Sequence, residues 1–259
     1  MLTSGQIAYF ETFGFLVLRQ LFTLGEVAII RCEADQLFNE ARDGNPYIGA
    51  REHLMPFFER GMFMSNLPDD NRIYDIGVSL MGPDFVLDGT EGNLMTGDSS
   101  WHCLKPAHGL VPSIKIAFYP DALTKDTGCL RFIPGSHKVG SPDLFAAFRN
   151  DDVYSGIRPF DMEPTEIPCY AVESQPGDVV VFTEKVVHAS FGGKDGRQQH
   201  VINFARNPQT AEQVAFFRSL YDASVRSLRP AESYVNSDRP RIRRMVSRLV
   251  ELGFETSKI

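Results

Sequence analysis

The fold is indicated most clearly by residues 113–136, which read SIKIAFYPDALTKDTGCLRFIPGS. Residues 113–119 and 130–133 are short runs rich in β-branched and aromatic side chains, and turn residues such as Pro, Asp and Gly stand between and after them. Strand-like runs interrupted in this way are typical of β structure. The stretch therefore predicts two strands of a β-rich core.

Similar runs on both sides extend this pattern from about residue 84 to residue 208. Further strands are predicted at 84–87, 92–96, 99–104, 166–171, 178–183, 189–192 and 200–205. Many short strands at such spacing indicate a sandwich or jelly roll. A separate strand is expected at 14–18, within a region that otherwise reads as helix and loop.

Helical patterns flank this β-rich region. Helices are predicted at 4–12, 24–42, 69–81, 210–223 and 240–252, and residues 43–66 read as loop. Thr3 with Gln6 and Thr23 with Glu26 fit the capping box that begins a helix. We therefore expect a mainly β protein with flanking helices, in one domain over residues 1–259. Its β core would span about 84–208, with the helical parts 1–83 and 209–259 packed on it.

Composition narrows the class of protein. The chain has 259 residues, of which 43% are hydrophobic, and carries 26 Lys+Arg against 33 Asp+Glu. This charge argues against a nucleic-acid binder. No stretch approaches the roughly 18–20 apolar residues of a membrane span, and the N-terminus does not resemble a signal peptide. Four cysteines without a CxxC pair suggest reduced thiols, so we expect a cytoplasmic protein. Arginines 239, 241, 243, 244 and 248 are interpreted as the solvated face of a helix.

Two histidines on predicted strands suggest an iron site. His102 lies in Trp101-His102-Cys103-Leu104, and His188 begins His188-Ala189-Ser190. Mononuclear Fe(II) oxygenases bind the metal with two histidines and one carboxylate, usually supplied as His-x-Asp. Leu104 stands at that place, on the same strand face as His102, and cannot bind a metal. A single buried histidine is more often a core residue than a ligand, so the interpretation depends on both.

A family resemblance joins these motifs. The chain resembles the phytanoyl-CoA dioxygenase family of Fe(II)/2-oxoglutarate-dependent oxygenases. The resemblance rests on five ordered stretches, 97–102, 114–119, 126–137, 175–182 and 188–190 with Arg197, and on the opening at 9–22.

The resemblance implies a double-stranded β-helix, the cupin-like jelly roll. It implies His102 and His188 as iron ligands, and Arg197, helped by Ser190, as the partner of the distal 2-oxoglutarate carboxylate. An arginine can bind a carboxylate through two hydrogen bonds at once. Lys115 and Asn93 are further candidates for contact with cosubstrate or substrate. We expect Fe(II) and 2-oxoglutarate as cofactors, molecular oxygen and a small-molecule substrate as partners, and a monomer or homodimer.

Leu104 leaves several interpretations open. The enzyme could be halogenase-like, with a halide at the vacant position, although leucine is bulkier than the residues that usually make such room. Leu104 could instead be a substitution, natural or introduced, that leaves the site disabled. Another carboxylate could reach the metal, but Asp98 and Glu184, four residues from their histidines, would lie roughly 13 Å away along a strand. The chain could also be a non-catalytic small-ligand binding protein or, more distantly, a two-histidine hydrolase.

Overall fold

Two antiparallel sheets form the core of the protein. The computed structural model describes residues 1–103, 110–138, 143–148, 156–222 and 229–259. The larger sheet has the order β1-β8-β5-β10-β3-β2. Its strands are β1 (Phe15–Leu18), β2 (Glu52–Leu54), β3 (Phe85–Met95), β5 (Ser113–Phe118), β8 (Val179–Thr183) and β10 (Arg197–Arg206). The smaller sheet has the order β4-β9-β6-β7, with β4 (Ser99–His102), β6 (Leu130–Phe132), β7 (Tyr170–Val172) and β9 (His188–Ser190).

Aromatic side chains hold the two sheets face to face. Phe15 of β1 stacks on Phe132 of β6 with ring centroids 4.6 Å apart. Phe182 of β8 lies 5.3 Å from the same ring. Aromatic pairs contribute about 0.5–1.5 kcal/mol beyond the area that they bury. This pair of facing antiparallel sheets confirms the predicted jelly roll.

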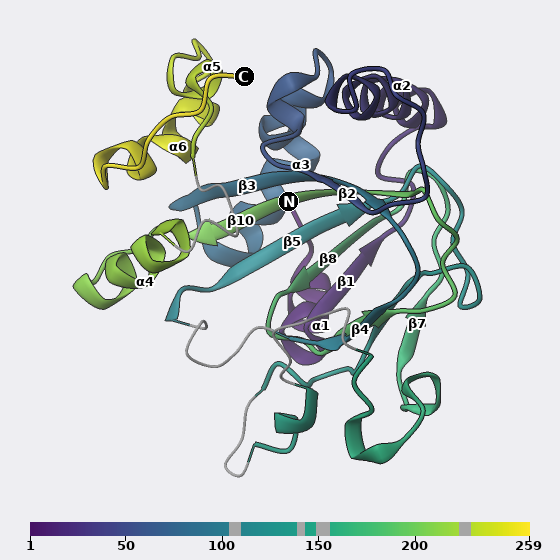
Figure 1. Cartoon of the computed structure of the whole chain (residues 1–259). Coiled ribbons are helices and arrows are strands. Elements are labelled where there is room, and N and C mark those ends of the chain that lie inside the picture. The colour runs from purple at the N-terminus through teal and green to yellow at the C-terminus, as the bar shows by residue number, and fades with distance from the viewer. Residues whose placement is uncertain (104–109, 139–142, 149–155, 223–228) are drawn as a thin grey trace.

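Several of the helices cover the outer face of the larger sheet (Figure 1). The helices are α1 (Ser4–Phe13), α2 (Leu24–Ala41), α3 (Asn71–Met81), α4 (Ala211–Asp222), α5 (Glu232–Val235) and α6 (Pro240–Glu251). Buried side chains of α2, α3 and α6 share one apolar cluster with outward-facing residues of β5, β8 and β10. Both predicted capping boxes are present, at Thr3 and Thr23. None of the described helices is long and apolar enough to cross a membrane.

The β core reaches further toward the N-terminus than predicted. β1 and β2 form the two edges of the larger sheet, so residues 1–83 are not only a helical covering. β2 was missed because three residues with mixed exposure show no period-2 pattern. It lies in the predicted loop 43–66, where two short 3-10 helices, Phe58–Arg60 and Met64–Asp69, also occur.

Two other strand predictions change in the structure. The strands predicted at 84–87 and 92–96 are one strand, β3, which passes through a bulge opposite Asn203 and Phe204. Glycine in a strand often marks a bulge, and Gly89 stands at this point with φ 149°. The strand predicted at 166–171 begins only at Tyr170, because Pro164–Glu166 form a 3-10 turn.

The arginines at the start of α6 and within it do more than cover a solvated face. Arg239 forms an ion pair with Asp69 at 2.9 Å. Arg241 lies over the ring of Tyr74, 4.3 Å from its centroid. Arg244 donates a hydrogen bond to the Tyr74 hydroxyl. These contacts attach the C-terminal helix to α3 and to the segment before it, so the basic cluster has a structural role that its charge pattern did not reveal.

Candidate active site

The two predicted histidines are neighbours in the smaller sheet. His102 ends β4 and His188 begins β9, and the two residues are direct partners in the antiparallel register. Their ring centroids are 4.1 Å apart. The pairing of β4 with β9 therefore brings together two residues that are 86 positions apart in sequence.

Backbone contacts orient both imidazoles in the same way. Nδ1 of His102 lies 2.7 Å from the carbonyl oxygen of Ser100, and Nδ1 of His188 lies 2.9 Å from that of Val186. A carbonyl can only accept, so each Nδ1 carries the proton and each Nε2 keeps its lone pair. The pKa of His188 lies well below its usual 6.5, mainly because the residue is buried and secondly because of the charge of His102. A neutral imidazole with Nδ1 bonded to a carbonyl is the form that binds metals.

No carboxylate joins this pair among the described residues. Leu104 lies outside them, and no group of three or more His, Cys, Asp or Glu side chains in the described ranges is placed to hold a metal ion. Asp98 accepts a hydrogen bond from the amide of Gly192 at 2.7 Å, and Glu184 accepts one from the Ser113 hydroxyl at 2.8 Å. The alternative of a third ligand from elsewhere in the chain gains no support from the part that the structure describes.

Arg197 is a buried cation with unused donors. Its residue is 2% exposed, and its Nη2 donates to the hydroxyl of Ser190 at 3.0 Å. Ser190 in turn donates to the carbonyl of Gly128 at 2.9 Å. Within the described structure, Nε and Nη1 of Arg197 have no hydrogen-bond partner. Leaving buried donors of a charged group unpaired is costly, which indicates that an anion belongs there.

Two glycines make room for this guanidinium. A Cβ atom on Gly128 would lie 1.7 Å from Arg197 Nη1, and one on Gly193 would lie 1.3 Å from the same atom. Gly128 also has φ +90°, which disfavours any side chain. Any larger residue at these positions would have to displace Arg197.

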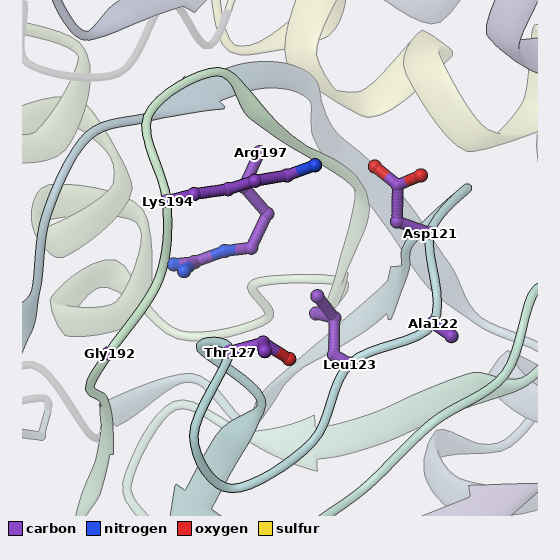
Figure 2. A pocket seen from close by; sticks show the side chains of 7 residues that line it. All are labelled: Asp121, Ala122, Leu123, Thr127, Gly192, Lys194 and Arg197. Atoms are coloured by element: carbon purple, nitrogen blue, oxygen red, sulfur yellow. The ribbon is translucent and has the colours of Figure 1, made fainter.

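A pocket of about 260 Å³ opens beside Arg197 (Figure 2). It lies between the loop after β5 and the loop before β10, and Lys194 extends across it toward Asp121. Neither His102 nor His188 lines it. The lining residues are Asp121, Ala122, Leu123, Thr127, Gly192, Lys194 and Arg197. The pocket therefore leads to the arginine from the loop side of the site.

The inner face of the larger sheet carries charged side chains. Lys115 Nζ lies 3.0 Å from Glu91 Oε1 and 3.7 Å from Glu184 Oε1. Lys115 is the direct β-sheet partner of Phe182, whose ring lies 4.9 Å from that of His188. Directly paired residues share a sheet face. The three charges, called here the Glu91–Lys115–Glu184 cluster, therefore lie on the face that looks toward the histidines.

Asn93, also predicted as a site residue, lies on this face of β3. It is 1% exposed, and its Nδ2 lies 3.5 Å from Gln199 Oε1. No partner of its Oδ1 occurs among the described residues. Lys115, by contrast, is engaged by two carboxylates, so its ammonium is not simply available to a cosubstrate.

Comparison with known proteins agrees with the family resemblance. Residues 93–198 match the model of the family described as "Phytanoyl-CoA dioxygenase (PhyH)". The matched residues lie within the β core and include His102 and His188. The match confirms the predicted family, together with the enzyme class and the cofactors that characterise it, iron and 2-oxoglutarate. No curated protein matches the sequence.

Solved structures share the fold of this chain. HygX from Streptomyces hygroscopicus, solved with nickel and 2-oxoglutarate bound, is 19% identical, with a TM-score of 0.64 over 79% of this chain and 87% of that chain. EctD from S. alaskensis is 20% identical, with a TM-score of 0.63 over 79% and 77%. The epimerase SnoN, in complex with Fe3+, alpha ketoglutarate and nogalamycin RO, is 19% identical, with a TM-score of 0.61 over 82% and 88%.

Several residues around the candidate site were not proposed as site residues from the sequence. Gly128 was considered only as part of a break between strands, and Gly193 was not singled out, although glycines near a predicted anion-binding arginine are a usable signal. Glu91 and Glu184 owe their place to strand register, which the sequence alone does not reveal. Trp101, the residue before His102, is buried, and its indole donates to the Pro164 carbonyl at 2.7 Å.

Proposed function

We propose that the chain binds Fe(II) through Nε2 of His102 and His188, anchors 2-oxoglutarate on Arg197, and oxidises a C–H bond of a small metabolite. The observation that carries this proposal is which nitrogen atoms of these side chains are already hydrogen-bonded and which are not. Both histidines use Nδ1 on the backbone and keep the Nε2 lone pair, while Arg197 holds two unpaired buried donors. Such residues fit a divalent metal and a carboxylate.

The chain itself supplies binding and orientation. The carbonyls of Ser100 and Val186 hold the imidazoles at a fixed angle, so the metal position is set by the backbone of the smaller sheet. Arg197 orients the distal carboxylate, and Ser190 holds the guanidinium in place through Nη2. Iron and 2-oxoglutarate, when bound, supply the oxidising chemistry together with molecular oxygen.

Fewer structural observations support the remaining assignments. We propose Asn93 as a contact to cosubstrate or substrate because its amide oxygen is buried and unpaired in the described structure. Lys115 is a weaker candidate because it pairs with Glu91. The small-molecule substrate, the monomeric or homodimeric state and the cytoplasmic location stay predictions from the sequence, and so does the absence of nucleic-acid binding.

Anaerobic titration with Fe(II) and 2-oxoglutarate, followed by visible absorption, tests the proposal. We expect a metal-to-ligand charge-transfer band that is absent in His188→Ala and much weaker in Arg197→Gln. A wild-type protein that shows no band, and binds no metal by equilibrium dialysis, would contradict the proposal.

The same titration separates the alternatives that Leu104 leaves open. A chloride-dependent shift of the band, with chlorinated product, would favour the halogenase-like enzyme. A band that appears only in Leu104→Asp would identify a disabled oxygenase. Stoichiometric 2-oxoglutarate binding that never leads to succinate, in wild type and in Leu104→Asp, would favour a binding protein.

A further inference from the structure

Tyr119 is a buried residue near Arg197 that the proposed function does not use. It directly follows β5 and is 4% exposed. Ala117 of β5 pairs with Val201 of β10, and both belong, with Tyr119, to an apolar cluster that contains members of both sheets. Alternate residues of an extended chain share a face. Tyr119 therefore faces the space between the sheets, as Arg197 and Gln199 do.

Strand register brings the Tyr119 ring close to Arg197. His200 pairs with Phe118, so the next residues, Gln199 and Tyr119, lie opposite each other. Arg197 precedes Gln199 by two residues on the same face, about 7 Å along the strand. Long side chains at such diagonal positions interact. In agreement with this, the charge of Arg197 acts on the Tyr119 hydroxyl and lowers its pKa, against a larger opposite effect of burial.

The Tyr119 hydroxyl keeps its proton at neutral pH. Burial raises the pKa of this group to about 12. The hydroxyl is therefore a hydrogen-bond donor, and a buried donor without an acceptor is costly. Where its proton points decides what the residue can bind.

Gln199 fixes the direction of that proton. Nε2 of Gln199 donates to Tyr119 Oη at 2.7 Å. An amide nitrogen can only donate, so the phenolic oxygen accepts here and its own proton points elsewhere. Asn93 Nδ2, at 3.5 Å from Gln199 Oε1, favours this orientation of the amide. No acceptor for the Tyr119 proton occurs among the residues that the structure describes.

The donors left over in this region match a carboxylate. Within the described structure, Nε and Nη1 of Arg197 have no partner, and the Tyr119 hydroxyl has no acceptor. A carboxylate has two oxygens with about four lone-pair sites, so one carboxylate can accept from all three atoms. A neutral amide would offer a single oxygen and add N–H donors of its own.

We propose that Tyr119 donates a third hydrogen bond to the distal carboxylate of 2-oxoglutarate, and that Gln199 is a positioning residue that turns the Tyr119 proton toward it. The inference rests on the proposed function, which assigns this carboxylate to Arg197. It adds a neutral donor to the charged one and gives the buried hydroxyl an acceptor.

Ligand affinities of the Co(II)-loaded protein, measured by isothermal titration without turnover, test the inference. Tyr119→Phe removes the hydroxyl and keeps the ring. We expect it to weaken 2-oxoglutarate binding by roughly tenfold to a hundredfold, the range for a lost hydrogen bond to a charged group. Oxalate can chelate the metal but has no distal carboxylate, so its affinity should stay unchanged. General damage to the site would weaken both ligands.

A double-mutant cycle tests the role of Gln199. Gln199→Met removes the amide donor and keeps the length of the side chain. The Tyr119 proton is then free to rotate, so we expect a loss of only several-fold in 2-oxoglutarate affinity. In the background of Tyr119→Phe the same substitution should have no effect, because the hydroxyl that it orients is gone.

Tyr9→Phe serves as the matched control. It makes the same chemical change on an exposed tyrosine of α1 and should leave both affinities unchanged. Thermal unfolding of each variant checks that it is folded.

The outcomes separate the inference from the proposed function. If Arg197→Gln weakens 2-oxoglutarate binding but Tyr119→Phe does not, the inference is wrong and the proposed function stands. Equal losses for 2-oxoglutarate and oxalate in Tyr119→Phe would show a structural role and also overturn it. An effect of Gln199→Met that is the same with and without the hydroxyl would overturn the positioning role. If the wild type binds neither Co(II) nor 2-oxoglutarate, the proposed function and the inference fail together.

Discussion

The two halves of the candidate site differ in how complete they are. The Arg197 half has a buried guanidinium, a serine that holds it, and two glycines that make room for it. The histidine half has two well-oriented imidazoles but an uncharged residue where the family motif has aspartate. Under the proposed function, we therefore expect that anchoring of the cosubstrate and binding of the metal can each be perturbed alone.

The largest effect is expected at Arg197. Replacing it by Gln removes the only charge that the proposal assigns to the distal carboxylate. We expect the affinity for 2-oxoglutarate to fall by about a hundredfold or more, because charge-assisted bonds to a buried arginine are strong. Isothermal titration with Co(II) in place of iron measures it. Affinity for Co(II) alone should stay unchanged, and its loss would contradict the separation of the two halves.

Restoring a carboxylate at position 104 should change metal binding in the histidine half of the site. We expect Leu104→Asp to raise Fe(II) affinity by roughly tenfold to a hundredfold, because an anionic ligand adds directly to the metal's coordination. Leu104→Asn is the matched control, since it has the same shape without the charge. Equal affinities of the two variants and the wild type would mean that residue 104 does not reach the metal.

Crowding of the guanidinium should give a smaller effect confined to the arginine half. A Cβ atom in Gly193→Ala would lie 1.3 Å from Arg197 Nη1, so the guanidinium must move. We expect 2-oxoglutarate affinity to fall by about tenfold, given that displacements of this size commonly weaken binding and catalysis. Gly5→Ala is the control, since its nearest neighbour atom is 3.9 Å away. An unchanged affinity would show that Arg197 does not bind the carboxylate from its present position.

The smallest effect at neutral pH is expected at His200, which contrasts with His188. His200 is fully buried against Phe57, and neither ring nitrogen has a partner among the described residues. Burial lowers its pKa to about 3, so below pH 6.5 the unfolded chain takes up a proton that the folded one does not. The wild type should therefore lose stability as pH falls from about 6.5 to about 3, by up to about 1.4 kcal/mol per pH unit.

His200→Phe should flatten this dependence and leave Fe(II) and 2-oxoglutarate binding intact. Urea unfolding at several pH values measures the slope for both proteins. Parallel slopes would show that His200 is not the group responsible.

The candidate site residues stand out in the sequence more clearly than their surroundings do. His102, His188 and Arg197 are recognisable because metal and carboxylate chemistry restrict residue type and spacing, and the β4–β9 register then places the histidines together. Glu184 was set aside because an extended strand would carry it roughly 13 Å from His188. The chain turns at Thr183–Val186 instead, and pairing with β5 brings Lys115 beside it. Such contacts depend on register between distant strands, which a single sequence does not encode locally.

Strand boundaries failed for similar physical reasons. A break was expected within β3 at its glycines, but the sheet absorbs Gly89 as a bulge and continues. β2 has only three residues and owes its existence to the exposed edge of β3. Local propensity predicts neither event, because both are decided by the neighbouring strand.

The unpaired donors of Arg197 also bear on the cost of binding an acid. The guanidinium is already held by Ser190 and has two glycines beside it, so both unpaired donors are in place before any ligand binds. A carboxylate that binds there would lose little affinity to the ordering of the arginine side chain.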